Sequence, residues 1–125
     1  MTVHASAEDY LEAILSLRMR QGNVRSIDIA NELNYTKPSV SVAMKKLRES
    51  GYIQMDADGA IILLPEGEEI AQRVYERHRL LTDFFIHLGV TPEVAASDAC
   101  KVEHDLSAET FERIKEFAQK ANLAE

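Results

Sequence analysis

The hydrophobic period of the chain changes from helical to strand-like directly after Gly51, and this change constrains the fold more than any other feature. Before it, apolar side chains recur at helical spacing in three stretches. After it, "YIQM" and "AIILL" have the composition of two short strands around an Asp58-Gly59 turn, a dipeptide that favours hairpins. The order helix, helix, helix, hairpin is that of a winged helix-turn-helix, in which the hairpin forms the wing.

The first two helices are expected over residues 6–20 and in the stretch "IDIANEL". Ser6 and Ser26 are placed to act as their N-caps, since a serine side chain can accept a hydrogen bond from the first turn. In the short second helix, Ile27 and Ala30, with Leu33, are expected to share the apolar face. Gly22 and Asn23 separate the two helices.

The third helix is expected to begin after Thr36 as N-cap, with Pro38 in its first turn, where a missing N–H costs nothing. Between Tyr35 and Arg48 there are basic residues but no acidic one, in a chain whose net charge is −7. The negative total argues against nonspecific nucleic-acid binding, yet a DNA-binding surface needs only local positive charge. Four apolar residues should pack inward, namely Val40, Ala43, Met44 and Leu47, and the opposite face carries Pro38, Ser41, Val42, Lys45 and Lys46. An inert α+β domain with the same element order is the alternative.

The second half of the chain is expected to be helical. Pro65 opens a long helix to about Leu88, Pro92 starts another over residues 92–105, and Ser107 caps the last one. The predicted fold is therefore mainly α, with a winged helix-turn-helix DNA-binding domain over residues 1–64 and a helical domain over residues 65–125.

Composition excludes several classes of protein. A chain of 125 residues is too short for a multidomain enzyme, and no window approaches the ~18 uninterrupted apolar residues that would span a membrane. The N-terminus lacks the pattern of a secretory signal, and the single cysteine cannot form an intramolecular disulfide. We therefore expect a cytoplasmic protein with no membrane partner and no small-molecule substrate.

The motif "DACKVEHDL" at residues 98–106 places a thiol, a carboxylate and an imidazole at helical positions i, i+3 and i+4. These side chains fall within an arc of ~100° on one helix and can converge. Such a set of sulfur, oxygen and nitrogen ligands suits divalent first-row transition metals. In the plainest alternative Cys100 is a small buried group, Glu103 is solvated and His104 is an interface histidine. In another, Cys100 is a nucleophile or redox group, although no orienting residue for His104 and no oxyanion loop are evident.

A metal site needs ligands from more than one helix, and two other places offer them. Asp9 and Glu12 lie three apart on the first helix, and His78 lies midway along the long one. Each also has an ordinary interpretation: the first two as an acidic first turn favoured by the helix dipole, and His78 as a surface histidine.

Four segments together resemble the metal-dependent repressors of the diphtheria toxin repressor and manganese transport regulator family. They are "EDYLEAILSL", "DIANELNYTKPSVSVAMKKLRESGYI", "LLPEGEEIAQRVYERHRLLTDFF" and "ACKVEHDLS". The resemblance covers nearly the whole chain, and the length is similar to that of two-domain members that lack a C-terminal SH3-like domain. It implies a non-enzymatic transcriptional repressor that acts as a homodimer on double-stranded operator DNA and uses a divalent metal as corepressor. The helical domain over residues 65–125 would then be its metal-binding and dimerisation domain.

The resemblance also implies the site residues. The metal ligands would be Asp9, Glu12, His78, Cys100, Glu103 and His104. Manganese regulators usually have a glutamate at the position of Cys100, whereas iron-type repressors have cysteine there and methionine in place of Asp9. The hard carboxylates favour Mn²⁺, whereas the thiolate favours Fe²⁺, Zn²⁺ or Co²⁺. Because Thr82 and Ala96 occupy the positions of the iron-type ancillary ligands, no ancillary site of that kind is expected.

For DNA contact, the residues matching Thr36, Pro38 and Val42 face the bases in the family. Val42 replaces a glutamine of the iron-type repressors, so an apolar contact to a thymine methyl is expected there. Lysines should mainly contact phosphates, and the acidic wing should contribute little. The complete expected DNA-binding set is Thr36, Lys37, Pro38, Ser39, Ser41, Val42, Lys45 and Lys46.

Overall fold

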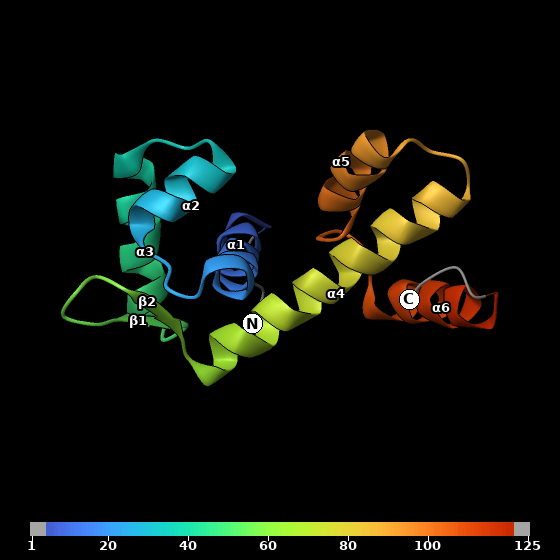
Figure 1. Cartoon of the computed structure of the whole chain (residues 1–125). Coiled ribbons are helices and arrows are strands. Elements are labelled where there is room, and N and C mark those ends of the chain that lie inside the picture. Colours follow the sequence, from blue (N-terminus) through green and yellow to red (C-terminus); the bar gives the residue numbers. More distant parts are fainter. Residues whose placement is uncertain (1–4, 122–125) are drawn as a thin grey trace. The chain divides into compact units, whose positions relative to one another are not determined.

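The structure is a computed structural model of the chain, and it describes residues 5–121. The elements follow in the order α1 (Ala5–Gln21), α2 (Ser26–Leu33), α3 (Lys37–Glu49), β1 (Ile53–Met55), β2 (Ile61–Leu63), α4 (Pro65–His87), α5 (Pro92–Val102) and α6 (Ala108–Lys120) (Figure 1). They form two compact units that divide within α4, between Arg73 and Val74. The predicted mainly helical fold with an N-terminal winged helix-turn-helix is confirmed.

In the first unit, α1, α2 and α3 surround a core of aliphatic side chains. Leu11, Leu15, Ile29, Val40 and Met44 are almost completely buried. A close approach of α2 and α3 around a short turn is what a helix-turn-helix requires. The turn between them passes through Asn34, whose left-handed φ of 58° is one that asparagine tolerates better than most residues.

The start of α3 is capped as the sequence predicts. Thr36 is the N-cap, its hydroxyl oxygen accepts a hydrogen bond from the Ser39 amide at 3.3 Å, and Pro38 lies in the first turn. Val40, Met44 and Leu47 point inward, and Ala43 is half-buried. The polar face of α3 is consequently left exposed.

The wing is a two-stranded antiparallel hairpin in which Gln54 pairs with Ile62. The Asp58-Gly59 turn lies between the strands, and Gly59 has the positive φ of 84° that glycine adopts freely. The hairpin is fastened to the segment before α2, because Ile61 donates a backbone hydrogen bond to Val24 at 2.7 Å and the Arg25 guanidinium donates to the Asp58 carbonyl. The wing is therefore an integral part of the first unit.

The second unit contains the C-terminal part of α4 with α5 and α6, which lie on either side of α4 in Figure 1. The rings of Phe84 on α4 and Phe117 on α6 make an edge-to-face contact with centroids 6.2 Å apart. Ser107 caps α6 as expected, accepting a hydrogen bond from the Thr110 amide at 3.1 Å.

Three local expectations are wrong. Helix α1 begins at Ala5, so Ser6 lies inside it and is not its N-cap. The N-cap of α2 is Arg25, and its amide is bound by the Asp28 carboxylate at 2.9 Å. In α2, Ile29 and Ala30 are buried and Ile27 is exposed.

The second unit also differs at the end of α5. Helix α5 ends at Val102, with Glu103 as its C-cap, and His104 lies in the following turn.

Among the described residues no helix is long and apolar enough to cross a bilayer.

Candidate metal centre and DNA-binding face

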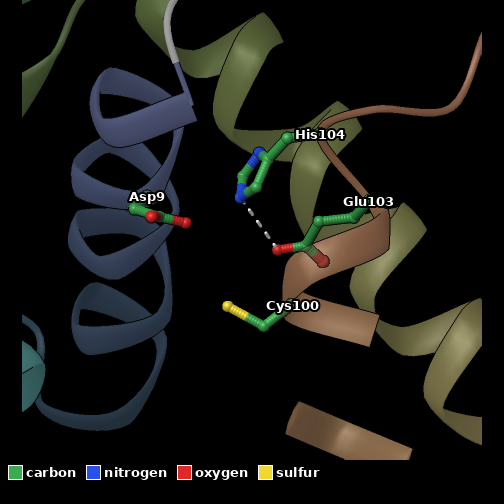
Figure 2. A group of neighbouring side chains, drawn as sticks. All are labelled: Asp9, Cys100, Glu103 and His104. Carbon is green, nitrogen blue, oxygen red and sulfur yellow. Dashed lines mark ion pairs between the residues drawn. The ribbon is translucent and has the colours of Figure 1, made fainter. Parts of the chain in front are cut away.

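The second unit brings together three of the predicted metal ligands at the end of α5. Figure 2 shows the thiol of Cys100, the carboxylate of Glu103 and the ring of His104, with the ion pair between the last two as a dashed line. One ligand atom from each of these residues lies within 4.8 Å of the others. His104 remains in this group although it lies beyond α5, because Glu103 keeps helical backbone angles and directs the chain into a tight turn.

Glu103 is the centre of the cluster. The residue is 1% exposed, which is exceptional for a glutamate. Oε2 lies 3.1 Å from Nδ1 of His78 on α4, and Oε1 lies 3.6 Å from Nε2 of His104. The two oxygens of one carboxylate therefore face two different imidazoles.

Glu103 Oε1 has no hydrogen-bond partner within the part of the chain that the structure describes. A buried carboxyl oxygen without a hydrogen bond costs about 1–3 kcal/mol, and such atoms are rare in folded proteins. A cation bound between Glu103 and its neighbours would satisfy this atom. The donor set of thiol, carboxylate and imidazole fits a divalent transition metal, and the buried oxygen fits it too.

The plain interpretations of Cys100 and Glu103 do not fit the structure. Cys100 is exposed and not buried, and Glu103 is buried and not solvated. His104 is largely buried, with 8% of its side chain exposed. The positions of Cys100 and Glu103 are the reverse of what their polarity alone would dictate.

In the first unit, Asp9 and Glu12 lie in the first half of α1, three positions apart and half-buried. Residues at this spacing are neighbours on a helix surface. Asp9 is also labelled in Figure 2. The adjacent Glu8 is bound to Arg73, with Nη2 to Oε2 at 3.2 Å.

Thr82 and Ala96 occupy the positions of the iron-type ancillary ligands. The Thr82 hydroxyl donates a hydrogen bond to the His78 carbonyl at 2.7 Å, and the side chain of Ala96 has no atom that could bind a metal. The Thr82 hydroxyl is thus used within α4.

The predicted DNA-binding residues gather at the N-terminal end and outer face of α3. All eight are exposed, and Val42 is 56% exposed although it is aliphatic. Arg48 adds a basic side chain to the last turn of α3, and the first turn contains no acidic residue. The arrangement presents small polar side chains, one apolar side chain and lysines on a single surface: Thr36, Lys37, Pro38, Ser39, Ser41, Val42, Lys45 and Lys46.

Sequence reasoning missed Arg77, which contacts the turn that carries Glu103 and His104. Its Nη1 donates to the carbonyls of Glu103 and Leu106, both at 2.9 Å. The sequence did contain a signal for Arg77, because it lies three residues after Val74 and four before Leu81. This helical spacing places it on the same face of α4 as these two buried residues.

Comparisons with known proteins agree with this architecture. Residues 2–61 match the family described as iron dependent repressor, N-terminal DNA binding domain, and residues 64–122 match its metal binding and dimerisation domain. The transcriptional regulator MntR of Salmonella typhimurium is 39% identical over 112 residues, covering 90% of this chain and 71% of the relative. The corresponding regulator of Listeria monocytogenes is 37% identical over 114 residues, covering 91% of this chain and 80% of the relative.

Solved structures give the same result. The manganese regulator SloR superimposes with a TM-score of 0.80 at 30% identity, covering 90% of this chain. A manganese-dependent transcriptional repressor solved with manganese gives a TM-score of 0.80 at 28% identity, covering 94% of this chain. This chain spans about half of their length, 53% and 52% respectively.

A winged helix-turn-helix followed by a helical unit with a thiol, a carboxylate and imidazoles defines the class of metal-dependent transcriptional regulators. The chain belongs to the iron-dependent repressor family, which its MntR relatives share. The prediction of a regulator and not an enzyme is confirmed by these relatives.

The predicted boundary at residues 64 and 65 stays a prediction. The two family domains meet between residues 61 and 64, whereas the compact units divide at Arg73.

Proposed function

We propose that this protein is a metal-responsive repressor in which Mn²⁺ or Fe²⁺ acts as corepressor and promotes operator binding by a homodimer. The observation that carries the proposal is Glu103, a buried carboxyl whose oxygens face His78 and His104 and whose Oε1 has no hydrogen-bond partner in residues 5–121. A metal-binding residue explains this costly arrangement, whereas a structural role does not.

The ligands we assign are Asp9, Glu12, His78, Cys100, Glu103 and His104. The cluster in the second unit supports four of them, and Asp9 and Glu12 are added from the family resemblance and from their shared face on α1. Glu103 would offer one oxygen on the side of His78 and the other on the side of His104 and Cys100. When bound, the ion supplies positive charge and directional coordination to these groups.

Coupling to DNA follows from thermodynamic linkage. A ligand stabilises the arrangement of the chain that binds it best, by its difference in affinity between arrangements. Helix α1 belongs to the DNA-binding unit. One ion bound by ligands on α1, α4 and α5 would therefore restrict the positions available to α3. Recognition helices in a dimer must match half-sites about 34 Å apart, so such a restriction favours operator binding. A coupling of ~1–3 kcal/mol is typical of such systems.

For the DNA contacts we assign distinct roles to the exposed residues of α3. Thr36, Pro38 and Val42 would face base edges, with Val42 against a thymine methyl. Lys37, Lys45 and Lys46 would contact phosphates, which makes affinity dependent on salt. The Ser39 and Ser41 hydroxyls are available for either kind of contact.

The homodimer is supported by apolar side chains that the second unit leaves exposed. Leu88 is 65% exposed and Val94 is 50% exposed, next to the turn between α4 and α5, and Ile86 adds to this surface. On α6, Phe111 is buried within the unit and Phe117 is 59% exposed. We therefore assign dimer contact to the corner between α4 and α5.

Regulation of manganese or iron homeostasis in the cytoplasm is the role we propose for the repressor. Asp9 and Glu12 supply the hard oxygens that Mn²⁺ prefers, and Cys100 supplies a softer sulfur that also accepts Fe²⁺, Zn²⁺ or Co²⁺. The solved structures named as manganese-dependent regulators favour manganese.

The test begins with operator selection, in which the purified protein enriches duplexes from a random-sequence pool in the presence of Mn²⁺. Fluorescence anisotropy with the selected duplex then measures affinity as Mn²⁺, Fe²⁺ or Zn²⁺ is added. We expect metal to tighten binding at least tenfold, and Cys100→Ala and His78→Ala to abolish the response.

Glu112→Ala is the control, because Glu112 is exposed on α6 and belongs to none of the assigned sites. It should respond to metal like the unaltered protein. DNA binding that is independent of metal and unchanged by either ligand substitution would refute the corepressor role and favour a redox or catalytic role for Cys100.

A further inference from the structure

Arg77 joins three elements of the second unit. From α4, its Nη1 atom donates hydrogen bonds to the carbonyl oxygens of Glu103 and Leu106, both at 2.9 Å. Its guanidinium carbon lies 5.0 Å from the centroid of the Phe111 ring on α6, within the range of a cation–π contact. One side chain thus holds the turn between α5 and α6 at both ends and packs against the next helix.

The turn that Arg77 holds carries two of the assigned metal ligands. Glu103 is the C-cap of α5, and His104 is the next residue. Carbonyl groups at the end of a helix lack partners within it and must be satisfied by other donors. A cation is also favourable there because of the negative end of the helix dipole. Arg77 meets both needs and thereby restricts the backbone from Glu103 to Leu106.

Arg77 and His78 are neighbours on α4, and both bind Glu103. Arg77 holds the main-chain carbonyl of Glu103 at 2.9 Å, and His78 lies 3.1 Å from its carboxylate. The backbone and the side chain of one glutamate are consequently fixed relative to the same turn of α4. This double attachment determines where the carboxylate lies with respect to the His78 ring.

We propose that Arg77 is a positioning residue of the metal centre, which sets the geometry of Glu103 and His104 without touching the ion. This inference rests on the proposed metal-binding function. Ligands must be held within about 0.5 Å of their productive positions, and loss of supporting contacts around metal ligands typically lowers affinity 10- to 100-fold. A turn released from Arg77 would sample other backbone positions and weaken binding by that mechanism.

The first experiment measures Co²⁺ affinity and the Co²⁺ absorption spectrum of the full chain with Arg77→Met. Methionine keeps apolar bulk over Phe111 but removes both hydrogen bonds. We expect affinity to fall about 10- to 100-fold and the ligand-field bands to shift because the coordination geometry changes. Arg79→Met is the matched control, since Arg79 is exposed and lies over the Tyr75 ring on the same helix. It should retain the affinity and spectrum of the unaltered protein.

Denaturant unfolding of the metal-free variants separates positioning from general destabilisation. Co²⁺ titrations are made under conditions where circular dichroism shows each variant to be folded, so lower stability alone leaves affinity and spectrum unchanged. If Arg77→Met does not fold, Arg77→Gln decides, because the shorter side chain keeps a donor but cannot span to both carbonyls. Affinity and spectrum like those of the unaltered protein in the folded variant would overturn the inference.

A combination with His104→Ala tests the route of the effect. If Arg77 acts through the turn that carries His104, Arg77→Met should lower Co²⁺ affinity by a smaller factor in the His104→Ala background, as in a double-mutant cycle. Equal losses in both backgrounds would overturn a role through this turn. An unaltered protein that binds no Co²⁺ would instead refute the proposed function itself, so the two failures are distinguishable.

Discussion

Nδ1 of His78 lies 3.1 Å from Oε2 of Glu103, although 25 residues separate the two along the chain. The contact connects the middle of α4 to the end of α5 inside the second unit. It leaves the other carboxyl oxygen, Oε1, buried and without a hydrogen bond within the described part of the chain. Such a buried oxygen is costly, and costly groups of this kind are typical of a site preorganised for a ligand.

Glu103→Met should raise the stability of the metal-free protein and lower its affinity for metal. Removing a buried oxygen that lacks a hydrogen bond recovers part of a cost of about 1–3 kcal/mol, less the lost contact with His78. We expect a net gain of roughly 1 kcal/mol in the free energy of unfolding, measured with denaturant in the presence of a chelator. Mn²⁺ affinity, measured by calorimetry, should fall at least tenfold.

Glu112→Met serves as the control for Glu103→Met, because Glu112 is exposed on α6. It should change the free energy of unfolding by less than about 0.5 kcal/mol and leave Mn²⁺ binding unaltered. A Glu103→Met protein that binds Mn²⁺ normally would show that Glu103 is not a ligand.

Cys100→Ser should change which metal the protein prefers. The substitution exchanges a soft sulfur for a hard oxygen of similar size, so affinity for Zn²⁺ and Co²⁺ should fall more than affinity for Mn²⁺. In the unaltered protein, bound Co²⁺ should show a sulfur-to-cobalt charge-transfer band in the near ultraviolet, and Cys100→Ser should remove it. Cys100 is the single cysteine of the chain. If the band persisted in Cys100→Ser, its source could not be Cys100. Absence of the band from the unaltered protein would exclude Cys100 as a ligand.

The sequence predicted the elements whose signals are local. Thr36 and Ser107 act as N-caps, and the Asp58-Gly59 turn joins the wing strands, because each depends on neighbours within about four residues. In the eight-residue α2 the local signal failed, since so short a helix hardly distinguishes a face centred on Ile27 from one centred on Ile29.

The candidate site was predictable only as a set of ligand types. The burial of Glu103 and the two carbonyl contacts of Arg77 depend on tertiary packing between α4 and the turn after α5, which are more than 20 residues apart. No local pattern specifies which of several charged residues will be enclosed by such packing. The resemblance to a family supplied the candidate ligands, and the structure supplied the contacts from which a positioning role for Arg77 is proposed.

Leu88→Lys should shift the protein from dimer to monomer. A charge placed on a leucine that is 65% exposed costs little within one protomer but is unfavourable in a desolvated apolar contact. Sedimentation at micromolar concentration should show the change. Ile62→Lys, on the exposed face of the wing, is the control and should leave the dimer intact. A monomeric unaltered protein would contradict the homodimer, and a dimeric Leu88→Lys protein would move the interface away from the corner between α4 and α5.

The Arg18–Glu68 pair should make a small contribution to stability that is lost in acid. Both nitrogen atoms of the Arg18 fork donate to the Glu68 carboxylate, at 2.6 and 2.8 Å, and these hydrogen bonds hold the pKa of Glu68 below its ordinary value. A carboxyl with a depressed folded-state pKa stabilises the fold above its unfolded-state pKa and ceases to do so as pH falls through the folded-state pKa. Arg18→Met should therefore lower stability near neutral pH by up to about 1 kcal/mol and have less effect below the folded-state pKa of Glu68. A loss of equal size at every pH would assign the effect to packing of the Arg18 stem.

Gly67→Ala should destabilise the first unit because of a close backbone approach. A Cβ atom at Gly67 would lie 2.1 Å from the carbonyl oxygen of Tyr52, which also accepts a hydrogen bond from the Leu64 amide at 2.9 Å. That hydrogen bond holds the carbonyl in place, so the added methyl must push α4 away from the end of the wing. Overpacking of this kind typically costs about 1–3 kcal/mol, more than the gain in helix propensity from alanine, which is about 1 kcal/mol. Thermal unfolding of Gly67→Ala should show a lower midpoint than Glu69→Ala, an exposed substitution on the same helix. Equal or greater stability of Gly67→Ala would mean that α4 and the wing separate at no cost.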